Sequence, residues 1–399
     1  MVKLIKYYYK SILLFILLAN DVKSQKWSSI ANFGGSARYC SVAFSIGNKG
    51  YVGTGWDSNC KSDFWEYDPS TNTWAEKASF PGTPRYVGVG FSIGNKGYIT
   101  TGYDCGAYTN DLWEYDPESD TWSQKAPFPS TVRAVAVGFS IGNKGYVGLG
   151  KDYDSLRTDF WEYDPLTDNW NQKANFGGSA RRYAVGFSIG EKGYIGTGND
   201  GSNSTDVTKD FWEYDPSTDN WSQKTDFPGK ARYVSVGFSL NNKGYIGLGW
   251  DGELTNIYQK DFFEYDPIND TWKEIDTLTG PAKEHAVAFS IGNAAYVGTG
   301  WNGYGLSGGF WKYTLPTPEP EVTKLEIFPN PVKDKFTITN PGNTISYIEI
   351  FGLRGKRLLS VIPEEKSILS VSLAGIASGI YDVRLTTKEG TIHKKIIVE

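Results

Sequence analysis

A unit of roughly fifty residues is repeated six times along most of this 399-residue chain. Tryptophan marks the repeat at positions 27, 74, 122, 170, 221 and 272, at intervals of 47, 48, 48, 51 and 51 residues. Each unit holds four short segments of strand-like composition, separated by turn sequences such as Gly-Asn-Lys-Gly. One small sheet cannot bury both of its faces, so each repeat must pack against its neighbours. The sequence therefore predicts an all-β fold in which six sheets form the blades of a propeller.

The two ends of the repeat array complement each other. The sixth unit reaches its third strand at 310–313, but no tryptophan of a fourth strand follows. Trp27, in contrast, precedes the first strand of the first unit. We expect the strand around Trp27 to complete the sixth blade, because a closed ring leaves no sheet edge exposed. The propeller is expected to span 26–315.

The repeat also carries a family resemblance. The segment Trp65-Glu66-Tyr67-Asp68-Pro69-Ser70-Thr71-Asn72-Thr73-Trp74 is similar to the Tyr-Asp-Pro…Trp segment of kelch repeats, and 85–102 is similar to their first two strands. Sequences such as Gly-Thr-Gly at 53–55 stand where the family has two adjacent glycines. The resemblance implies a six-bladed kelch β-propeller.

Targeting and linking segments are expected on both sides of the repeats. Basic residues followed by the apolar run from Ser11 to Ala19 are typical of a secretory signal peptide, which we place at 1–24. The run is too short to cross a bilayer, so we expect no transmembrane span in the mature protein. Prolines and acids at 316–321 predict a linker. Beyond it, alternating apolar residues predict a small immunoglobulin-like β-sandwich.

The sequence of this last region is distinctive in four places. They are Ile327-Phe328-Pro329-Asn330-Pro331-Val332, 350–356, 373–381 and 394–398. Together they make 322–399 resemble the C-terminal sorting domain of type IX secretion substrates in Bacteroidetes-type bacteria. The resemblance implies that 322–399 has the type IX secretion machinery as a partner, and that the protein is secreted or displayed on the outer cell surface.

The loops between the second and third strands differ between repeats, whereas the turns at the opposite ends of the strands are nearly constant. Variable loops on a rigid framework are where binding usually occurs. These loops are rich in aromatic and acidic residues, which suit an extracellular glycan or a protein partner. The candidate binding residues there are Trp56, Tyr103, Tyr153, Trp250, Tyr258, Trp301 and Tyr304.

A basic residue also starts the first strand of every repeat. It can belong to a basic ring near the central channel that grips a carboxylate, or it can brace blades against repeated glutamates such as Glu66. We favour bracing, since a feature present in every repeat is more often structural than a binding site. The six residues are Arg38, Arg85, Arg133, Arg181, Arg232 and Lys283.

Composition excludes several classes of site. A net charge of −5 argues against nucleic-acid binding. The chain has two histidines, and the one in the repeats, His285, is expected to be packed on an inner strand rather than to hold copper or act in a triad. We predict no metal, no cofactor and no catalytic residue. Cys60 and Cys105 fall in equivalent loops of neighbouring repeats, where an exported chain permits a disulfide, with Cys40 left buried.

The leading functional hypothesis is a secreted or cell-surface protein that binds a glycan or a protein through its variable face. One alternative is a carbohydrate-active enzyme of the kelch-type sialic acid epimerase kind, which the chain resembles in architecture. A structural surface component is the third reading.

Overall fold

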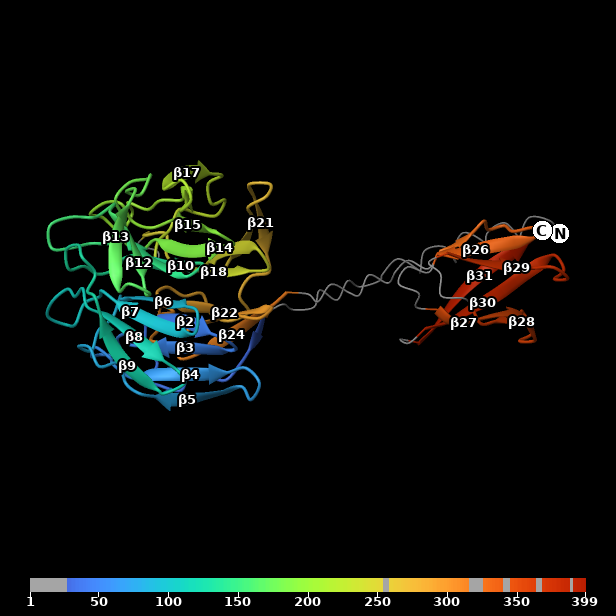
Figure 1. Cartoon of the computed structure of the whole chain (residues 1–399), viewed down its shortest axis with the longest axis horizontal. Helices are drawn as coiled ribbons and strands as arrows, with labels where there is room; N and C mark the ends of the chain where they lie inside the picture. The colour runs from blue at the N-terminus through green and yellow to red at the C-terminus, as the bar shows by residue number, and fades with distance from the viewer. Residues whose placement is uncertain (1–26, 254–257, 316–325, 340–344, 364–367, 388–389) are drawn as a thin grey trace, which may run out of the picture. The chain divides into compact units, whose positions relative to one another are not determined.

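The computed structural model describes residues 27–253, 258–315, 326–339, 345–363, 368–387 and 390–399. The chain divides into two compact units, Met1–Leu315 and Pro316–Glu399 (Figure 1). The signal peptide expected at 1–24 and the linker expected at 316–321 lie outside the described residues. The regular elements of the described part are strands, and this part has no helix that is long and apolar enough to cross a membrane.

The first unit consists of six four-stranded antiparallel sheets, which we call blades 1 to 6 in the order of their first strands. The first strands are β2 (Val42–Ile46), β6 (Val89–Ile93), β10 (Val137–Ile141), β14 (Val185–Ile189), β18 (Val236–Leu240) and β22 (Val287–Ile291). The second strands are β3 (Lys49–Gly53), β7 (Lys96–Thr100), β11 (Lys144–Gly148), β15 (Lys192–Gly196), β19 (Lys243–Gly247) and β23 (Ala294–Gly298).

The outer half of each blade has the same regularity. The third strands are β4 (Phe64–Asp68), β8 (Leu112–Asp116), β12 (Phe160–Asp164), β16 (Phe211–Asp215), β20 (Phe262–Asp266) and β24 (Phe310–Thr314). The fourth strands are β5 (Thr73–Lys77), β9 (Thr121–Lys125), β13 (Asn169–Lys173), β17 (Asn220–Lys224), β21 (Thr271–Ile275) and, in blade 6, β1 (Trp27–Ser29). The predicted six-bladed propeller is confirmed, and β1 closes its last blade.

Alternating side chains on the first strands build the interfaces between blades. In β10, Val137, Phe139 and Ile141 are buried while the residues between them are half-buried. At five of the six interfaces the inner phenylalanine of one blade packs against a second-strand glycine of the next, and in blade 6 Ala295 takes the place of this glycine. At Gly145 an added Cβ would lie 2.4 Å from the ring of Phe91, so this close approach requires glycine.

A ring of six backbone hydrogen bonds joins the blades at one end of the central channel. In each blade, one residue shortly before the first strand has a positive φ, between 51° and 56°. Its N–H donates to the carbonyl of the corresponding residue in the preceding blade, at 3.0–3.3 Å. The six residues are Cys40, Val87, Val135, Tyr183, Val234 and His285. Because the N–H of Cys40 donates to His285, the ring is closed.

The strand that closes blade 6 is anchored by a buried tryptophan. β1 pairs with β24 so that Trp27 lies opposite Tyr313. The indole N–H of Trp27 donates to the carbonyl of Asp276 at 2.9 Å, and its ring packs on Phe262 and Tyr313 at centroid distances of 4.8 and 5.0 Å. Equivalent tryptophans of the other blades donate to carbonyls of the preceding blade, as Trp122 does to Ala78. These tryptophans therefore belong to the framework.

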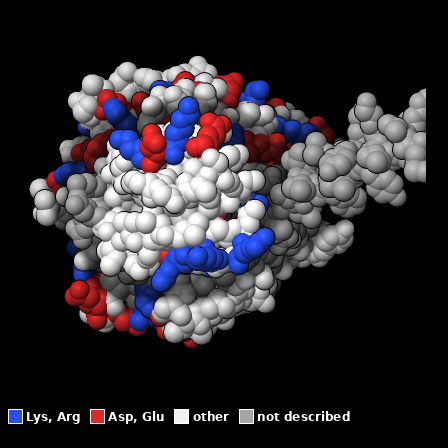
Figure 2. All heavy atoms as spheres, turned by 90° about the vertical axis from the view of Figure 1, so that its right-hand side faces the viewer, with Lys and Arg blue, Asp and Glu red and all other residues white. Residues whose placement is uncertain are grey.

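The face with constant turns is covered by short-range ion pairs. Each second-strand lysine of blades 1 to 5 pairs with the aspartate of the same blade's Tyr-Asp-Pro turn, as Lys96 does with Asp116 at 2.6 Å. Figure 2 views the side on which β24 ends: basic and acidic side chains lie next to one another above an uncharged central region, and a row of basic side chains borders it below. Because the turns of this face are alike from blade to blade, specific binding is expected on the opposite face, where the loops differ.

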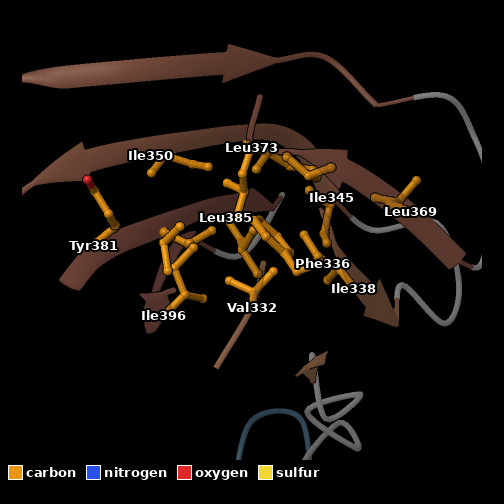
Figure 3. Packing of buried hydrophobic residues seen from close by; sticks show 14 residues of the cluster. Val332, Phe336, Ile338, Ile345, Ile350, Leu369, Leu373, Tyr381, Leu385 and Ile396 are labelled. Carbon is orange, nitrogen blue, oxygen red and sulfur yellow. The ribbon is translucent and has the colours of Figure 1, made fainter. Parts of the chain in front are cut away.

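The second unit is a small β-sandwich. One sheet contains β25 (Ile327–Phe328), β26 (Lys335–Thr339) and β29 (Ile368–Ser372). The other contains β28 (Arg357–Val361), β27 (Ile345–Gly352), β30 (Gly379–Thr387) and β31 (Gly390–Val398). Alternate residues of both sheets meet in one core, in which Phe336, Ile350 and Leu385 are fully buried (Figure 3).

Replacing the anchor of β1 tests the closure of the ring. We expect Trp27→Ala to lower the free energy of unfolding by about 3–5 kcal/mol, because a large buried ring is lost from the blade 5–blade 6 interface. Urea unfolding followed by tryptophan fluorescence measures the change. Trp250→Ala, in a partly exposed loop, is the matched control and should cost less than 1 kcal/mol, roughly what surface substitutions cost. Equal losses in the two variants would contradict the closing role of β1.

Candidate functional site

The repeated basic residues are buried inside their own blades. The guanidinium groups of blades 1 to 5 are 0–1% exposed. Each makes two hydrogen bonds to the aspartate just before the third strand, as Arg133 does to Asp159 at 2.6 and 2.8 Å. Each also lies over a phenylalanine ring, at 4.8–5.0 Å from its centroid. The partners are Asp63, Asp111, Asp159, Asp210 and Asp261.

These contacts correct the expected pairing. The repeated glutamates do not brace the arginines; each accepts a hydrogen bond from the second-strand tyrosine opposite it, as Glu162 does from Tyr146 at 2.7 Å. The alternative of a basic ring around the channel is also wrong, because buried and ion-paired guanidinium groups cannot reach a ligand there. The six residues that this alternative named are buried and belong to the framework. They are Arg38, Arg85, Arg133, Arg181, Arg232 and Lys283.

Blade 6 departs from this pattern. Lys283 replaces the arginine, and Gly309 stands at the position of the aspartate. The Lys283 ammonium lies 4.2 Å from the Trp311 ring centroid and donates to the hydroxyl of Ser307 at 3.2 Å. Burial lowers the pKa of Lys283 to about 7, and no carboxylate of the described residues forms an ion pair with it.

The residue after each repeated cation lies on the face of the variable loops. Each pairs, through an isolated antiparallel bridge, with the third residue after the second strand of its blade, in the loop that leads to the third strand. Side chains at these paired positions differ from blade to blade, although the surrounding framework is constant. The pairs are Tyr39–Trp56, Tyr86–Tyr103, Ala134–Lys151, Arg182–Asn199, Tyr233–Trp250 and Glu284–Trp301.

A pocket opens on this face beside Ala134, which has the smallest side chain of the six residues that follow the repeated cations. Its volume is about 460 Å³, and it lies among blades 2, 3 and 4. Most blades carry a larger side chain at the position of Ala134, and such a side chain would occupy this space. We call it the tyrosine pocket; its polar and aromatic lining consists of Tyr86, Tyr103, Tyr108, Tyr153, Tyr183, Lys151 and Arg182.

Loop contacts hold the tyrosines in place. The hydroxyl of Tyr153 accepts a hydrogen bond from the backbone N–H of Tyr108 at 3.0 Å, and the two rings lie 4.7 Å apart. Tyr153 of blade 3 thus leans on the loop of blade 2, although it is 63% exposed. Burial raises the pKa of Tyr108, while the charge of Arg182 acts in the opposite direction. The guanidinium therefore lies close enough to act electrostatically on this wall.

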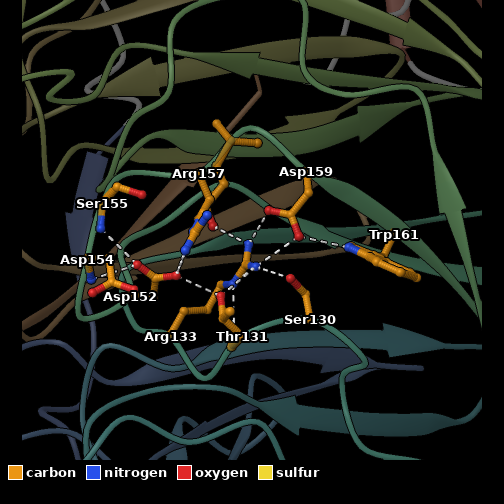
Figure 4. A network of polar contacts seen from close by, with 10 residues as sticks. Ser130, Thr131, Arg133, Asp152, Asp154, Ser155, Arg157, Asp159 and Trp161 are labelled. Atoms are coloured by element: carbon orange, nitrogen blue, oxygen red, sulfur yellow. Dashed lines mark hydrogen bonds and ion pairs between the residues drawn. The ribbon is translucent and has the colours of Figure 1, made fainter.

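A buried carboxylate fixes the loop that carries Lys151 and Tyr153. Asp152 accepts hydrogen bonds from the N–H groups of Asp154 and Ser155, from the Thr131 hydroxyl at 2.8 Å and from Arg157 at 2.5 Å (Figure 4). Burial opposes the charge, but these hydrogen bonds hold the pKa of Asp152 well below its usual range. Asp152 therefore stays ionised and keeps the loop in one conformation.

A disulfide fixes the neighbouring wall. Cys60 of blade 1 is bonded to Cys105 of blade 2, with their Cα atoms 6.1 Å apart. Cys105 lies between Tyr103 and Gly106, which both line the tyrosine pocket. The bond ties two variable loops together beside the pocket. Cys40 is a buried free thiol.

The two units match two family models. Residues 37–81 match the kelch motif, and residues 326–399 match the secretion system C-terminal sorting domain. The chain is a kelch propeller with a type IX sorting domain. The sorting domain engages the secretion machinery and directs the kelch propeller to the cell surface or the extracellular space.

Two known proteins are similar to the kelch propeller. The solved structure titled "Structure of YjhT", itself a kelch-type propeller, aligns with a TM-score of 0.60 and 16% identity over 70% of this chain and 94% of that chain. This likeness concerns the fold. N-acetylneuraminate epimerase of Salmonella typhi is 33% identical over 63 residues, which span 15% of this chain and 16% of the epimerase.

The tyrosine pocket contains two of the loop aromatics expected from the sequence, Tyr103 and Tyr153. Others lie outside it: Trp56, Trp250, Tyr258 and Trp301 are partly exposed on the same face of the kelch propeller, and Tyr304 is 99% exposed at a loop tip. Sequence reasoning missed Arg182, Tyr183 and Tyr86. Comparing the residue that follows each repeated cation would have found Tyr86 and Arg182, because this position varies between blades. Tyr183 stands one position later, where most blades have a smaller side chain.

Lys283 gives the kelch propeller a pH dependence. Between pH 7 and the ordinary lysine pKa of 10.5, the folded state binds fewer protons at this residue than the unfolded chain, so its contribution to stability rises with pH. Below pH 7 both states are protonated and the contribution is constant. We expect the melting temperature of the wild type to rise between pH 7 and pH 9. In Lys283→Met the rise should be smaller, because the contribution of the lysine is lost.

The exposed residue Lys260 supplies the control for this measurement. Lys260→Met should leave the slope of melting temperature against pH unchanged. An unaltered slope in Lys283→Met would show that the lysine is charged in the folded state throughout this range.

Proposed function

We propose that the kelch propeller is an extracellular binding protein whose tyrosine pocket holds an acidic saccharide. The observation that carries the proposal is the composition of the pocket: five tyrosines surround two cations that have no carboxylate partner among the described residues. The type IX sorting domain supports a ligand that is met outside the cell.

The tyrosines support a sugar as the ligand. Aromatic faces pack against the C–H faces of a sugar ring, and tyrosine hydroxyls exchange hydrogen bonds with its hydroxyl groups. The volume of about 460 Å³ is in the range of small-molecule sites. Such a pocket suits one or two sugar residues better than the broad contact of a protein partner.

The unpaired cations support an acidic group on that sugar. Arg182 donates from Nε to the side-chain oxygen of Asn199 at 3.2 Å, and no ion pair joins Arg182 or Lys151 to a residue that the structure describes. The repeated arginines, in contrast, are all neutralised within their blades. A carboxylate or sulfate between Lys151 and Arg182 would make charge-assisted hydrogen bonds to both.

A second candidate is a carbohydrate-active enzyme. The similarity of 63 residues to N-acetylneuraminate epimerase favours it. Incubating the protein with acidic sugars and following their proton NMR spectra separates the two functions. A pure binding protein leaves the spectrum of the sugar unchanged at long times, whereas an epimerase or hydrolase produces a new sugar.

Removing the charge of Arg182 tests the acidic part of the proposal. After a glycan array has identified an acidic ligand, we expect Arg182→Met to weaken it about 10- to 100-fold, because a hydrogen bond to a charged group contributes about 1.5–3 kcal/mol. Isothermal titration calorimetry of the purified protein measures the change. Tyr304→Ala, outside the pocket, should bind like the wild type. Unaltered binding in Arg182→Met would locate the site elsewhere.

Filling the pocket tests its position. Blades 1, 2 and 5 carry tyrosine at the position of Ala134, so Ala134→Tyr introduces a side chain that this framework already accommodates. We expect normal folding by circular dichroism and no measurable binding of the acidic sugar. Retained affinity in a folded Ala134→Tyr protein would exclude the tyrosine pocket as the site.

A further inference from the structure

Four of the variable loops are tied to the framework through an aspartate. In blade 3, the guanidinium of Arg133 donates to the hydroxyl oxygen of Thr131 at 3.3 Å, and this hydroxyl donates to Asp152 in the loop at 2.8 Å. Blades 1, 4 and 5 have the same contact between residues 21 positions apart, so the side chain two positions before the repeated cation holds the loop aspartate. The four pairs are Ser36–Asp57, Thr131–Asp152, Ser179–Asp200 and Lys230–Asp251.

The loop of blade 2, which forms one wall of the tyrosine pocket, lacks this contact. Thr83 and Asp104 stand at the corresponding positions, but no hydrogen bond joins them in the described part of the chain. The carboxylate of Asp104 instead accepts hydrogen bonds from two N–H groups of its own loop, at 3.0 and 2.7 Å. Among the hydrogen bonds, ion pairs and disulfides of the described residues, the Cys60–Cys105 bond alone links 104–107 to another blade.

The disulfide leads from this loop tip to a loop that is firmly held. Cys60 lies in the variable loop of blade 1, close in sequence to Asp57. The carboxylate of Asp57 accepts a hydrogen bond from the Ser36 hydroxyl at 2.5 Å and pairs with Lys61 at 2.9 Å. Ser36 in turn accepts a hydrogen bond from the buried guanidinium of Arg38 at 2.9 Å. The disulfide therefore gives the loop of blade 2 the attachment to the framework that its own aspartate does not supply.

The tip that the disulfide holds connects two tyrosines of the pocket. Tyr103 precedes the tip, Tyr108 follows it, and Gly106 within it also lines the pocket. Tyr108 reaches the next blade as well, because its backbone N–H donates to the hydroxyl of Tyr153 at 3.0 Å. A tip that is free to move spreads the positions of both rings, and ordering them again when a ligand binds costs affinity.

We propose that the Cys60–Cys105 disulfide positions the blade 2 wall of the tyrosine pocket and makes binding of the acidic saccharide depend on redox state. This inference rests on the proposed function and adds a regulation of the same site. Cys105 is exposed and Cys60 is partly exposed, so a dithiol reductant reaches the bond in the folded protein. Each sulfur of the broken bond takes up one electron and one proton, and the two thiols of the reductant form a disulfide in exchange. Since the cytoplasm keeps thiols reduced, the pocket reaches its binding form only after export.

Hydrogen exchange measures whether the bond holds the wall. We expect dithiothreitol to accelerate amide exchange in 103–108 of the full chain by about tenfold or more, because the tip opens locally. Exchange in 151–157 should stay unchanged, because Asp152 holds the loop of blade 3 without a disulfide. Mass spectrometry follows both segments in the same sample. Equal protection of 103–108 before and after reduction would overturn the inference.

Calorimetry measures the effect on binding, with galacturonic acid, glucuronic acid and a sulfated galactose as probes. For the probe that binds the oxidised wild type most tightly, we expect an affinity about tenfold lower after reduction, because the wall is no longer preorganised. The double variant Cys60→Ser/Cys105→Ser should bind as weakly as the reduced wild type, with or without reductant. A folded double variant that binds like the oxidised wild type would reject the inference.

Two further variants separate the local effect from a loss of stability and from the third cysteine. Trp27→Ala is destabilised at the interface of blades 5 and 6, and it should keep both the affinity of the wild type and its response to reductant. Cys40→Ala lacks the buried free thiol and should respond to reductant like the wild type. If Trp27→Ala loses as much affinity as reduction does, overall stability explains the effect and the inference is rejected.

The proposed function and the inference fail in different ways. If Arg182→Met weakens the bound probe but reduction does not, the acidic-saccharide pocket stands and the redox dependence is rejected. If none of the acidic probes and no acidic sugar of the array binds, the proposed function and the redox dependence of binding are rejected together. The exchange measurement then still decides whether the disulfide holds the wall of the pocket.

Discussion

The fold depends on the ring of six backbone hydrogen bonds that joins the blades around the central channel. Each donor sits in the left-handed region, with φ between 51° and 56°. Three of the six are valine, for which such a conformation costs about 1–3 kcal/mol. The cost is sustained because the bonds, the packing between blades and the closed ring all require the same geometry. Strain of this kind persists only where surrounding structure over-determines it.

This ring also aims the variable side chains. The residue before each strained position lies on the loop face, where it pairs with a residue of its blade's variable loop. Six side chains are thus brought around one axis by identical backbone, and their chemistry differs only through sequence. Alanine in blade 3 leaves a pocket, arginine in blade 4 supplies a positive charge, and glutamate in blade 6 supplies a negative one. The same repeat therefore supplies both the constant framework and the variable residues of the site.

The sequence predicted the number of blades, the strand that closes the ring and the face that varies, because each depends on periodicity. It failed on the partners of the arginines, because pairing depends on register. Glu162 lies directly opposite Tyr146 and is thereby directed away from Arg133, whereas Asp159, which precedes the strand, meets the guanidinium. The tyrosine pocket escaped prediction for a related reason. The pocket depends on the small side chain of Ala134 and on the contact of Tyr153 with Tyr108 of blade 2. Neither feature follows from composition.

The position of β1 has a consequence for the timing of folding. Trp27 pairs with Tyr313, so the last sheet of the propeller needs segments from opposite ends of the repeat array. Contacts so distant in sequence form slowly, since the whole intervening chain must be ordered before they add stability. During synthesis the first of these segments emerges long before the second. A chain that is still being made therefore lacks its final sheet, and the ring cannot close until the last strand of the propeller has been synthesised.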